Sequence, residues 1–448
     1  MAVGVLMLAL QVAVPKPMQV VQRDPDGTGR VEIAGTLDGD QAEGAEAIEA
    51  RFGSGPWREI VAKPPAGPFR GALEHIPTGR GRVTVRVRGQ HRDDVEIADV
   101  GVGEVFVVIG QSNAEGRVPH RQRWRDALVG GTRDVPTPSF FRDVAWSEAD
   151  DPAADGTKKG SVWPAVAAHL AEGTHVPIGF IVLARTATSL VKPPDWSPTG
   201  GDYARMNALV GAATGESRHV RAVLFWGGQG DVLHHVPRAR FVTAVGELTA
   251  ALHRDLGPST ALVLDEVGQV FDPRAQMPDV ENIRAAQLDA VDQGVAVWGP
   301  GTCDLDPRMP DTDGRHLQAP AEVELAARHW SSAIRAHFFG GPARRPTLVG
   351  VRAAVDGATL TVTFDCGVDP SHTPPTAFEV QTGGLALDIA RLESAPGADK
   401  RAVRLVLAQP VRGPFTVSFG RGNAGCALPA ADPDGLAARP FLEAVPTP

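Results

Sequence analysis

The sequence predicts an α/β fold with a β-sandwich on either side of it. Between residues 101 and 338, short apolar runs alternate with longer segments of helical periodicity, which is typical of a parallel sheet covered by helices on both faces. Before and after that region, apolar and polar residues alternate with a period of two between turns rich in Gly and Pro, which favours antiparallel strands. The chain has 448 residues, 43% of them hydrophobic, so it can build several cores.

Residues 1–100 are predicted to form an N-terminal β-sandwich. Alternating strands are expected at 30–37 and 81–89, and the apolar run at 6–14 also has the pattern of a strand. Only the segment 40–52, "DQAEGAEAIEARF", has a helical pattern.

Residues 101–338 are predicted to form the α/β domain. Buried parallel strands are expected over 104–110, 176–184, 221–228, 260–268 and 295–300. Crossover helices are expected over 163–173, 240–257, 281–294 and 319–338. Because parallel strands are joined by such crossovers, the sheet should lie between two helical layers.

Residues 339–448 are predicted to form a C-terminal β-sandwich. The segment 339–347, "FGGPARRPT", has the composition of a linker. Short alternating strands are expected after it, over 348–355, 358–367, 401–410 and 414–420.

Charge and hydropathy exclude some classes of function. The net charge is -9 and no run of Lys or Arg stands out, so we expect no nucleic-acid partner. No stretch approaches the roughly 18 uninterrupted apolar residues of a membrane span. The N-terminus lacks a positive segment before Lys16, so we expect no signal peptide and a cytoplasmic or particle-associated protein, with secretion as the alternative.

The three cysteines, Cys303, Cys366 and Cys426, form no disulfide framework and lack zinc-ligand spacing. Cys366 and Cys426 lie in the same predicted sandwich and could pair, although three free buried thiols are favoured. We expect no metal and no organic cofactor.

The stretch "GEVFVVIGQSNAEGR", residues 103–117, places a serine just past the first strand of the predicted sheet. Ligands bind at the carboxyl ends of the strands in such folds, so Ser112 should face the ligand site. Gly110 permits a tight turn before it. Position alone favours a helix cap over a nucleophile, so a catalytic role needs further support.

A base and its orienting carboxylate are available late in the predicted domain. His316 lies in a Gly-containing loop just before the last helix, and Asp313 precedes it by three residues. Within one turn, that spacing lets the carboxylate bind the imidazole Nδ1 while Nε2 faces outward.

Two further strand ends can supply an oxyanion hole. The strand 221–228 ends in two glycines followed by Gln229, Gly230 and Asp231, and glycines allow close approach to the backbone. The neighbouring strand leads into "RTATSL", where the Ala187 N–H is a candidate donor.

Two other chemistries have weaker support. Asp231, His234 and His235 have a spacing that suits metal ligands on one helix face, but no further ligand is evident nearby. The segment "GVGEV" at 101 precedes its strand and lacks the third glycine of a dinucleotide loop.

Together these residues resemble the SGNH (GDSL-like) hydrolase superfamily, and specifically its sialate O-acetylesterase and acetylxylan esterase branch. "GQSNAEG" resembles the block with the nucleophile, at Ser112; "WGGQGD" resembles the Gln-Gly-Glu block of the oxyanion hole, at Gln229 and Gly230; "DGRH" resembles the last block, at Asp313 and His316. The resemblance extends over the whole length. It implies a flavodoxin-like three-layer α/β/α domain, often preceded by a β-sandwich.

Two positions depart from the pattern of the family. Its second block usually has Gly-Gly-Thr-Ser, where this chain has Thr186, Ala187, Thr188 and Ser189. Its acidic residue after Gln-Gly is usually glutamate, where this chain has Asp231. Both changes leave the nucleophile and the base in place but allow reduced or altered activity.

The resemblance implies a carbohydrate O-acetylesterase with a Ser112–His316–Asp313 triad, and with oxyanion donors from Ser112, Ala187, Gln229 and Gly230. Substrate contacts are expected from Gln111, Asn113, Asp231 and Trp196, the last in a proline-rich loop, whereas Trp226 is expected to be buried. The alternative is a glycan-binding protein of this fold with little or no activity, for example a phage tail or particle component that acts on a host surface polysaccharide and meets its partners through the β domains.

Overall fold

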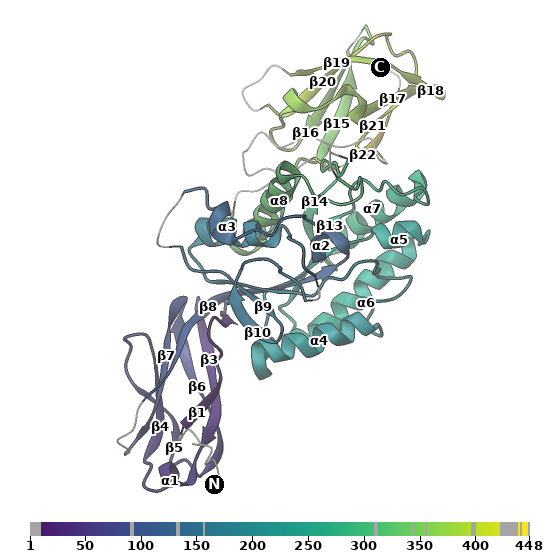
Figure 1. The fold of residues 1–448 in the computed structure, drawn as a ribbon. Helices are drawn as coiled ribbons and strands as arrows, with labels where there is room; N and C mark the ends of the chain where they lie inside the picture. Colours follow the sequence, from purple (N-terminus) through teal and green to yellow (C-terminus); the bar gives the residue numbers. More distant parts are fainter. Residues whose placement is uncertain are drawn as a thin grey trace.

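The computed structural model describes residues 10–89, 94–130, 135–155, 157–308, 312–341, 345–354, 356–395, 400–421, 438–439 and 441–446. The chain forms an elongated molecule in which the N-terminal sheets, a central α/β region and the C-terminal sheets follow one another in sequence order (Figure 1). The apolar run predicted as a strand is described from Leu10 onward, and its first residues lie outside the described part.

Two N-terminal sheets enclose one apolar core, which includes Val31, Ile33, Val83 and Val85. The first sheet has the order β1-β3-β6, and the second is built on β4, β5 and β7, with β2 and β8 beside them. The bounds are β1 Leu10–Val14, β2 Val20–Gln22, β3 Thr28–Leu37, β4 Ala47–Phe52, β5 Arg58–Ala62, β6 Gly67–Pro77 and β7 Gly79–Arg88.

The helix predicted over 40–52 is wrong. Only one turn is helical, α1 (Gly39–Ala42), and the rest forms β4, which pairs with both β5 and β7. Across β4 and β7, Glu49 accepts hydrogen bonds from Arg86 at 2.9 Å and from Arg88 at 2.7 Å. Pairing with two neighbouring strands therefore overrides the local helical preference.

The strand β8 (Val95–Gly110) is 16 residues long and joins the N-terminal sheets to the central sheet. Its first half pairs antiparallel with β7, and its second half lies parallel between β11 (Ile178–Val182) and β12 (Ala222–Trp226). The position between residues 100 and 101, where the sequence suggests a domain boundary, therefore lies inside one continuous strand.

The central sheet confirms the five predicted parallel strands. Its order is β10-β9-β11-β8-β12-β13-β14, in which β8, β11, β12, β13 (Ala261–Glu266) and β14 (Val297–Gly301) are parallel. These five strands have the chain order 2-1-3-4-5, a doubly wound arrangement. β9 (Ser139–Arg142) and β10 (Ala145–Glu148) add a hairpin at one edge.

Helices cover both faces of this sheet. On β8, Val105, Val107 and Ile109 join the core that contains residues of α4, α6 and α7, whereas Phe106 and Val108 join the core that contains α3 and α8. The predicted helices are α3 (Trp163–Thr174), α6 (Arg238–Leu256), α7 (Met277–Asp292) and α8 (Pro320–Phe338), and α4 (Gly201–Thr214) was not predicted. Short helical turns are α2 Ser112–Glu115, η1 Trp124–Ala127, η2 Gly215–Ser217 and α5 Gln229–Leu233.

Two four-stranded C-terminal sheets, β15-β16-β20-β19 and β18-β17-β21-β22, share a core that includes Leu360, Val362, Val380 and Val417. Their strands are β15 Leu348–Ala353, β16 Thr359–Phe364, β17 Phe378–Thr382, β18 Leu385–Leu387, β19 Ile389–Ser394, β20 Ala402–Leu407, β21 Phe415–Phe419 and β22 Phe441–Val445, with the turns η3 Pro370–His372 and η4 Pro375–Ala377. The prediction missed β17, β18, β19 and β22.

The cysteines differ from the expectation. Cys303 is disulfide-bonded and packs in the core of the C-terminal sheets. Cys366 takes part in no disulfide, so the pairing of Cys366 with Cys426 is wrong. The expectation of three free thiols is also wrong, because Cys303 is disulfide-bonded. Cys426 itself lies outside the described residues.

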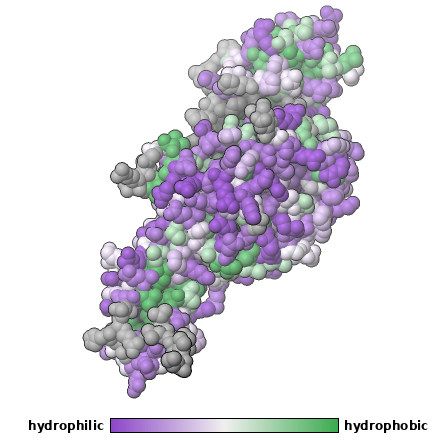
Figure 2. Space-filling model, in the orientation of Figure 1, coloured by the Kyte–Doolittle hydropathy of each residue, from purple (hydrophilic) through white to green (hydrophobic). Residues whose placement is uncertain are grey.

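The surface is mixed. Over the central region, the face seen in Figure 2 is mainly hydrophilic, and hydrophobic patches lie over the N-terminal and C-terminal sheets. On the C-terminal sheets the exposed large apolar side chains include Val349, Leu385 and Leu442. Among the described helices, none combines the length and the apolar character that a membrane crossing requires.

Candidate active site

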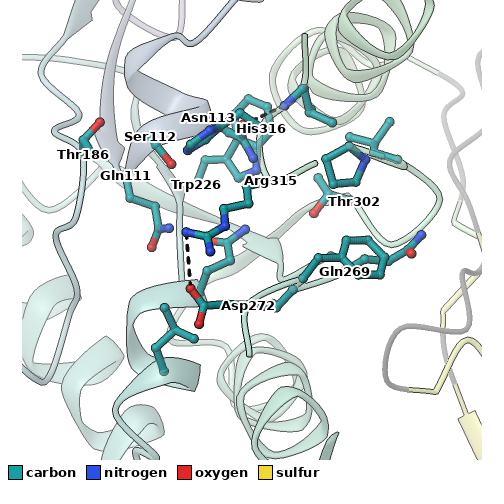
Figure 3. Close-up of a pocket in the computed structure, with 18 of the residues that line it drawn as sticks. Gln111, Ser112, Asn113, Thr186, Trp226, Gln269, Asp272, Thr302, Arg315 and His316 are labelled. Atoms are coloured by element: carbon teal, nitrogen blue, oxygen red, sulfur yellow. Dashed lines mark hydrogen bonds and ion pairs between the residues drawn. The ribbon is translucent and has the colours of Figure 1, made fainter. Parts of the chain in front are cut away.

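A cavity of about 240 Å³ lies at the carboxyl ends of the parallel strands. Each of the five strands contributes a residue from the segment that follows it: Ser112 after β8, Ala187 after β11, Gln229 after β12, Gln269 after β13 and Thr302 after β14. Figure 3 shows side chains from these segments around one space. The cavity thus lies at the end of the sheet where ligands bind in open α/β folds.

The turn before Ser112 requires glycine. Gly110 has φ +123°, and a Cβ there would lie 2.0 Å from the carbonyl oxygen of Trp226 on β12. The next residue, Gln111, donates its backbone N–H to that same oxygen at 3.1 Å. Ser112 follows as the first residue of α2, is 8% exposed, and lines the cavity.

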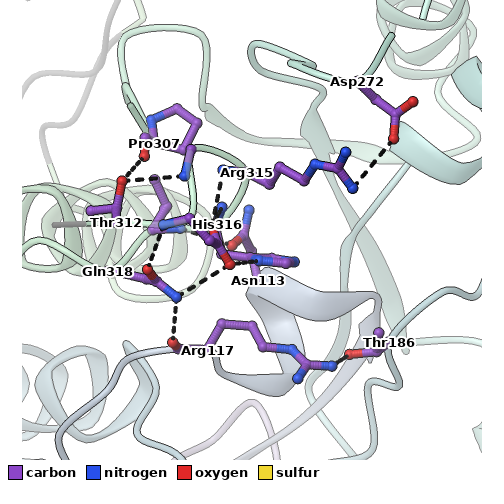
Figure 4. Close-up of polar contacts among 12 residues, drawn as sticks. Asn113, Arg117, Thr186, Asp272, Pro307, Thr312, Arg315, His316 and Gln318 are labelled. Atoms are coloured by element: carbon purple, nitrogen blue, oxygen red, sulfur yellow. Dashed lines mark hydrogen bonds and ion pairs between the residues drawn. The ribbon is translucent and has the colours of Figure 1, made fainter. Parts of the chain in front are cut away.

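Asp313 and His316 form a hydrogen-bonded pair. The Asp313 carboxylate oxygen lies 2.7 Å from His316 Nδ1, so Nε2 is the ring nitrogen left for a hydroxyl proton. The other carboxylate oxygen accepts the backbone N–H groups of Arg315 at 3.0 Å and His316 at 2.9 Å. Figure 4 shows Arg315, His316 and Gln318 of this loop beside Asn113. Partial burial alone would raise the pKa of Asp313, but these hydrogen bonds hold it below its usual value, so the residue is a carboxylate near neutral pH.

Two amide side chains tie this loop to the nucleophile turn. Asn113 Oδ1 accepts the N–H of Leu317 at 3.2 Å, directly linking the turn after β8 to the loop of His316. Gln318 accepts the N–H of Asp313 at 3.0 Å and donates to the backbone oxygen of Arg117 at 3.4 Å. Gln318 was not identifiable from the sequence, because its only signal is its position near Asp313 and His316.

The altered second block keeps a conformation that favours glycine. Ala187 lines the cavity with φ +63°, in the left-handed region. Thr186 before it donates its N–H to Glu115 at 2.9 Å, and the Thr188 hydroxyl lies 2.9 Å from the carbonyl oxygen of Gly110. The loop is thus fixed to the nucleophile segment on both sides of Ala187.

Three residues that were predicted to contact a substrate or an oxyanion are instead engaged within the protein. The Gly230 N–H donates to Gln111 Oε1 at 3.0 Å, so it is not available to an oxyanion, although Gln111 itself lines the cavity. Asp231 is fully buried and accepts two backbone N–H groups instead of contacting the cavity. Trp196 is also fully buried, with its indole N–H 2.8 Å from the Thr188 hydroxyl, so the expected sugar platform is wrong.

Charged residues at the rim were not singled out from the sequence. Asp272 carries hydrogen bonds from Arg274, and Arg315 lies 3.7 Å from it. The hydrogen bonds and charge of Arg274, with the charge of Arg315, lower the pKa of Asp272 to about 2, so it stays ionised. For Asp272 and Arg274, the available signal was their place just after the predicted strand 260–268.

Buried side chains support the cavity at Trp226 and at the segment that follows β13. Trp226 is 1% exposed, as expected, and packs against Trp163 and Trp330, with ring centroids 6.2 and 5.7 Å away. On α7, the buried Arg284 donates to the carbonyl oxygens of Val267 at 3.1 Å and Gly268 at 3.2 Å, and to Gly420 O at 2.6 Å. The wall after β13 is therefore connected to the end of β21.

The metal alternative loses its support. Asp231 is buried and engaged with backbone, and His235 binds Asp279 at 2.6 Å through Nδ1. Within the described part of the chain, no three His, Cys, Asp or Glu side chains gather in a way that could hold a metal ion.

Comparisons with known proteins point to one family. A family model described as a carbohydrate esterase, sialic acid-specific acetylesterase, matches residues 102–335. The fold is shared with a carbohydrate acetylesterase from Xanthomonas citri, with a TM-score of 0.62 and 16% identity over 97% of this chain and 99% of that one. A protein from Arabidopsis thaliana has a TM-score of 0.42 and 21% identity over 53% and 99% of the two chains, and a family two carbohydrate esterase from Cellvibrio japonicus has 0.32 and 13% over 73% and 95%. No curated protein sequence matches significantly.

Proposed function

Because the chain belongs to the carbohydrate esterase family described as sialic acid-specific acetylesterases, and so is an SGNH carbohydrate esterase, we propose that it removes acetyl groups from sugars or polysaccharides through an acyl-enzyme on Ser112. The observation that carries this proposal is the 2.7 Å contact between Asp313 and His316 Nδ1, in a loop whose His316 lines the same cavity as Ser112.

In the first half of the reaction, Ser112 Oγ attacks the acetyl carbonyl carbon. His316 Nε2 takes the hydroxyl proton, and Asp313 holds the imidazole tautomer and stabilises the imidazolium. When the tetrahedral intermediate collapses, the imidazolium returns that proton to the departing sugar oxygen. The products at this point are the free sugar hydroxyl and an acetyl ester on Ser112.

The negative charge of the intermediate needs hydrogen-bond donors close to the former carbonyl oxygen. We assign this role to the backbone N–H groups of Ser112 and Ala187 and to the side-chain amide of Gln229, whose residues all line the cavity. Gly230 is left out, because its N–H is already bound by Gln111.

In the second half, a water molecule attacks the acetyl carbon while His316 accepts one of its protons. Collapse of this second intermediate breaks the bond to Ser112 Oγ, which regains a proton from His316. Acetate leaves, and the enzyme returns to its starting state.

Replacement of Ser112 by Ala tests the nucleophile. We expect acetate release from p-nitrophenyl acetate and from acetylated polysaccharides to fall by about 10³-fold or more, because nucleophile and base act as a unit. Thermal unfolding should be unchanged, since only one hydroxyl is lost. Ser217→Ala, at an exposed position that does not line the cavity, is the control and should keep full activity. A Ser112→Ala enzyme with wild-type turnover would refute the proposal.

We further propose that residues 1–100 and 339–448 are β-sandwich domains flanking a hydrolase domain of residues 101–338. Support comes from the two separate apolar cores of the N-terminal and C-terminal sheets. The first boundary falls within β8, so the N-terminal part and the serine strand should unfold together. We expect a single transition for both parts in differential scanning calorimetry, which tests this coupling.

A further inference from the structure

Asp231 is a buried carboxylate that does not touch the cavity. Its side chain has no solvent exposure, and it forms no ion pair with any described residue. Instead, one oxygen accepts the N–H of Leu190 at 3.0 Å and the other accepts the N–H of Val191 at 2.8 Å. Both N–H groups belong to the loop that carries Ala187. A carboxylate in this place therefore holds the second block by its backbone.

The other end of this connection is the short helix α5. Asp231 lies on α5 two residues after Gln229, which lines the cavity. Between them, Gly230 donates its N–H to Gln111 Oε1 at 3.0 Å, next to Ser112. One turn of helix thus joins the three segments that would supply oxyanion donors: the nucleophile turn, the second block and Gln229.

Other hydrogen bonds hold the second block to the nucleophile segment, at Glu115 and Gly110, and to the loop that follows the block. The Ser189 N–H donates to Asp195 at 3.0 Å, and the Trp196 indole N–H lies 2.8 Å from the Thr188 hydroxyl. These contacts shape the loop, and Thr188 connects it to Gly110. The two hydrogen bonds from Leu190 and Val191 to Asp231 connect it to α5.

We propose that Asp231 is a positioning residue for the oxyanion hole, which fixes the Ala187 loop relative to Gln229. This inference rests on the proposed esterase function, because it assumes that those two residues stabilise one oxyanion. A donor displaced by 1 Å loses much of its effect on the transition state while leaving ground-state binding nearly intact.

The two backbone donors fit the ionised form of Asp231, which accepts on both oxygens and predominates at neutral pH. Burial raises the pKa of Asp231 to about 6 despite the backbone N–H groups of Leu190 and Val191, and the nearby Asp195 raises it further. An ionised group in such a place is costly for folding. An asparagine would keep one acceptor but would turn an NH₂ group towards the second N–H, so the loop would be released on one side.

Asp151 provides a matched control for replacement of Asp231 by asparagine. Asp151 also accepts two backbone N–H groups, from Gln122 at 3.0 Å and Ser161 at 2.9 Å. Burial raises its pKa to about 6 as well, but Asp151 does not line the cavity. Asp231→Asn and Asp151→Asn therefore make the same chemical change at two carboxylates of similar pKa, of which Asp151 is partly exposed and Asp231 fully buried.

We expect Asp231→Asn to lower kcat on p-nitrophenyl acetate by about 10- to 10²-fold with little change in KM. Asp151→Asn should keep kcat within about twofold of wild type, even where the two variants have similar melting temperatures. Asp231→Glu, which keeps the carboxylate, should have a higher kcat than Asp231→Asn. Equal kcat values for the two asparagine variants would overturn the inference.

If Asp231→Asn does not fold, hydrogen exchange on the wild-type enzyme decides the question. The amide protons of Leu190 and Val191 should exchange as slowly as those of β8, and rapid exchange would show that Asp231 does not hold the loop. Failure of the proposed function is separable, because it would show as full activity of Ser112→Ala, whatever the behaviour of Asp231 variants.

Discussion

Replacement of Gly110 by Ala should damage both the fold and the site. Gly110 has φ +123° and stands two residues before Ser112. The added Cβ would lie 2.0 Å from the oxygen of Trp226, whereas real contacts of this kind stay above 3.0 Å. The end of β12 must therefore move by about 1 Å away from β8, and Gln229 should move with it.

The cost can be divided into two parts. The positive φ alone strains an alanine by about 1–2 kcal/mol. Displacement of Trp226 adds about 1–3 kcal/mol of overpacking and weakens the 3.1 Å hydrogen bond from the Gln111 N–H, which costs about 1–3 kcal/mol when a buried partner is lost. We expect a total destabilisation of about 3–8 kcal/mol.

Gly67→Ala isolates the first part. Gly67 has φ +109°, and a Cβ there would meet nothing within 4 Å. In urea unfolding, Gly110→Ala should lose at least about 2 kcal/mol more than Gly67→Ala. Any folded Gly110→Ala should also lose about 10²-fold in kcat, because the serine and Gln229 are displaced relative to each other. Equal unfolding free energies for the two variants would refute this reasoning.

Two further predictions follow from the same structure. Ala187→Gly should keep kcat within a few-fold and change the melting temperature little, because relief of strain at φ +63° is offset by the greater freedom of glycine in the unfolded chain; a tenfold loss of kcat would show that the methyl group itself contributes. Asp151 has a folded-state pKa of about 6 against 3.8 for a free Asp, so its contribution to stability is fully present below pH 3.8 and is lost as pH rises to about 6. The unfolding free energy of wild type relative to Asp151→Asn should thus fall by about 3 kcal/mol between pH 3.5 and pH 7, and a pH-independent difference would contradict it.

Local patterns predicted the central sheet well. Apolar runs such as 104–110 and 221–228 are buried on both faces, so their composition alone marks them as parallel strands. Their order along the chain then placed Ser112, Gln229 and His316 at one edge, where all three line the cavity. The Asp313–His316 pair could also be predicted from the sequence, because a contact within one turn depends only on nearby residues.

Contacts between distant segments could not be predicted in this way. The segment 47–52 is a strand because β5 and β7 pair with it, although its composition favours a helix. The cavity rim at Asp272 and Arg315 depends on two loops that meet only in the folded chain.

The sequence by itself determined the type of central fold and the chemical groups of the candidate site, because periodicity and short motifs are local properties. Only the tertiary structure decided which polar groups remain available for a substrate. Gly230 and Asp231 stand beside Gln229 in the chain, yet their hydrogen bonds go to Gln111, Leu190 and Val191. A buried polar group must find a partner, and that partner is chosen by packing between segments that the chain brings together only on folding.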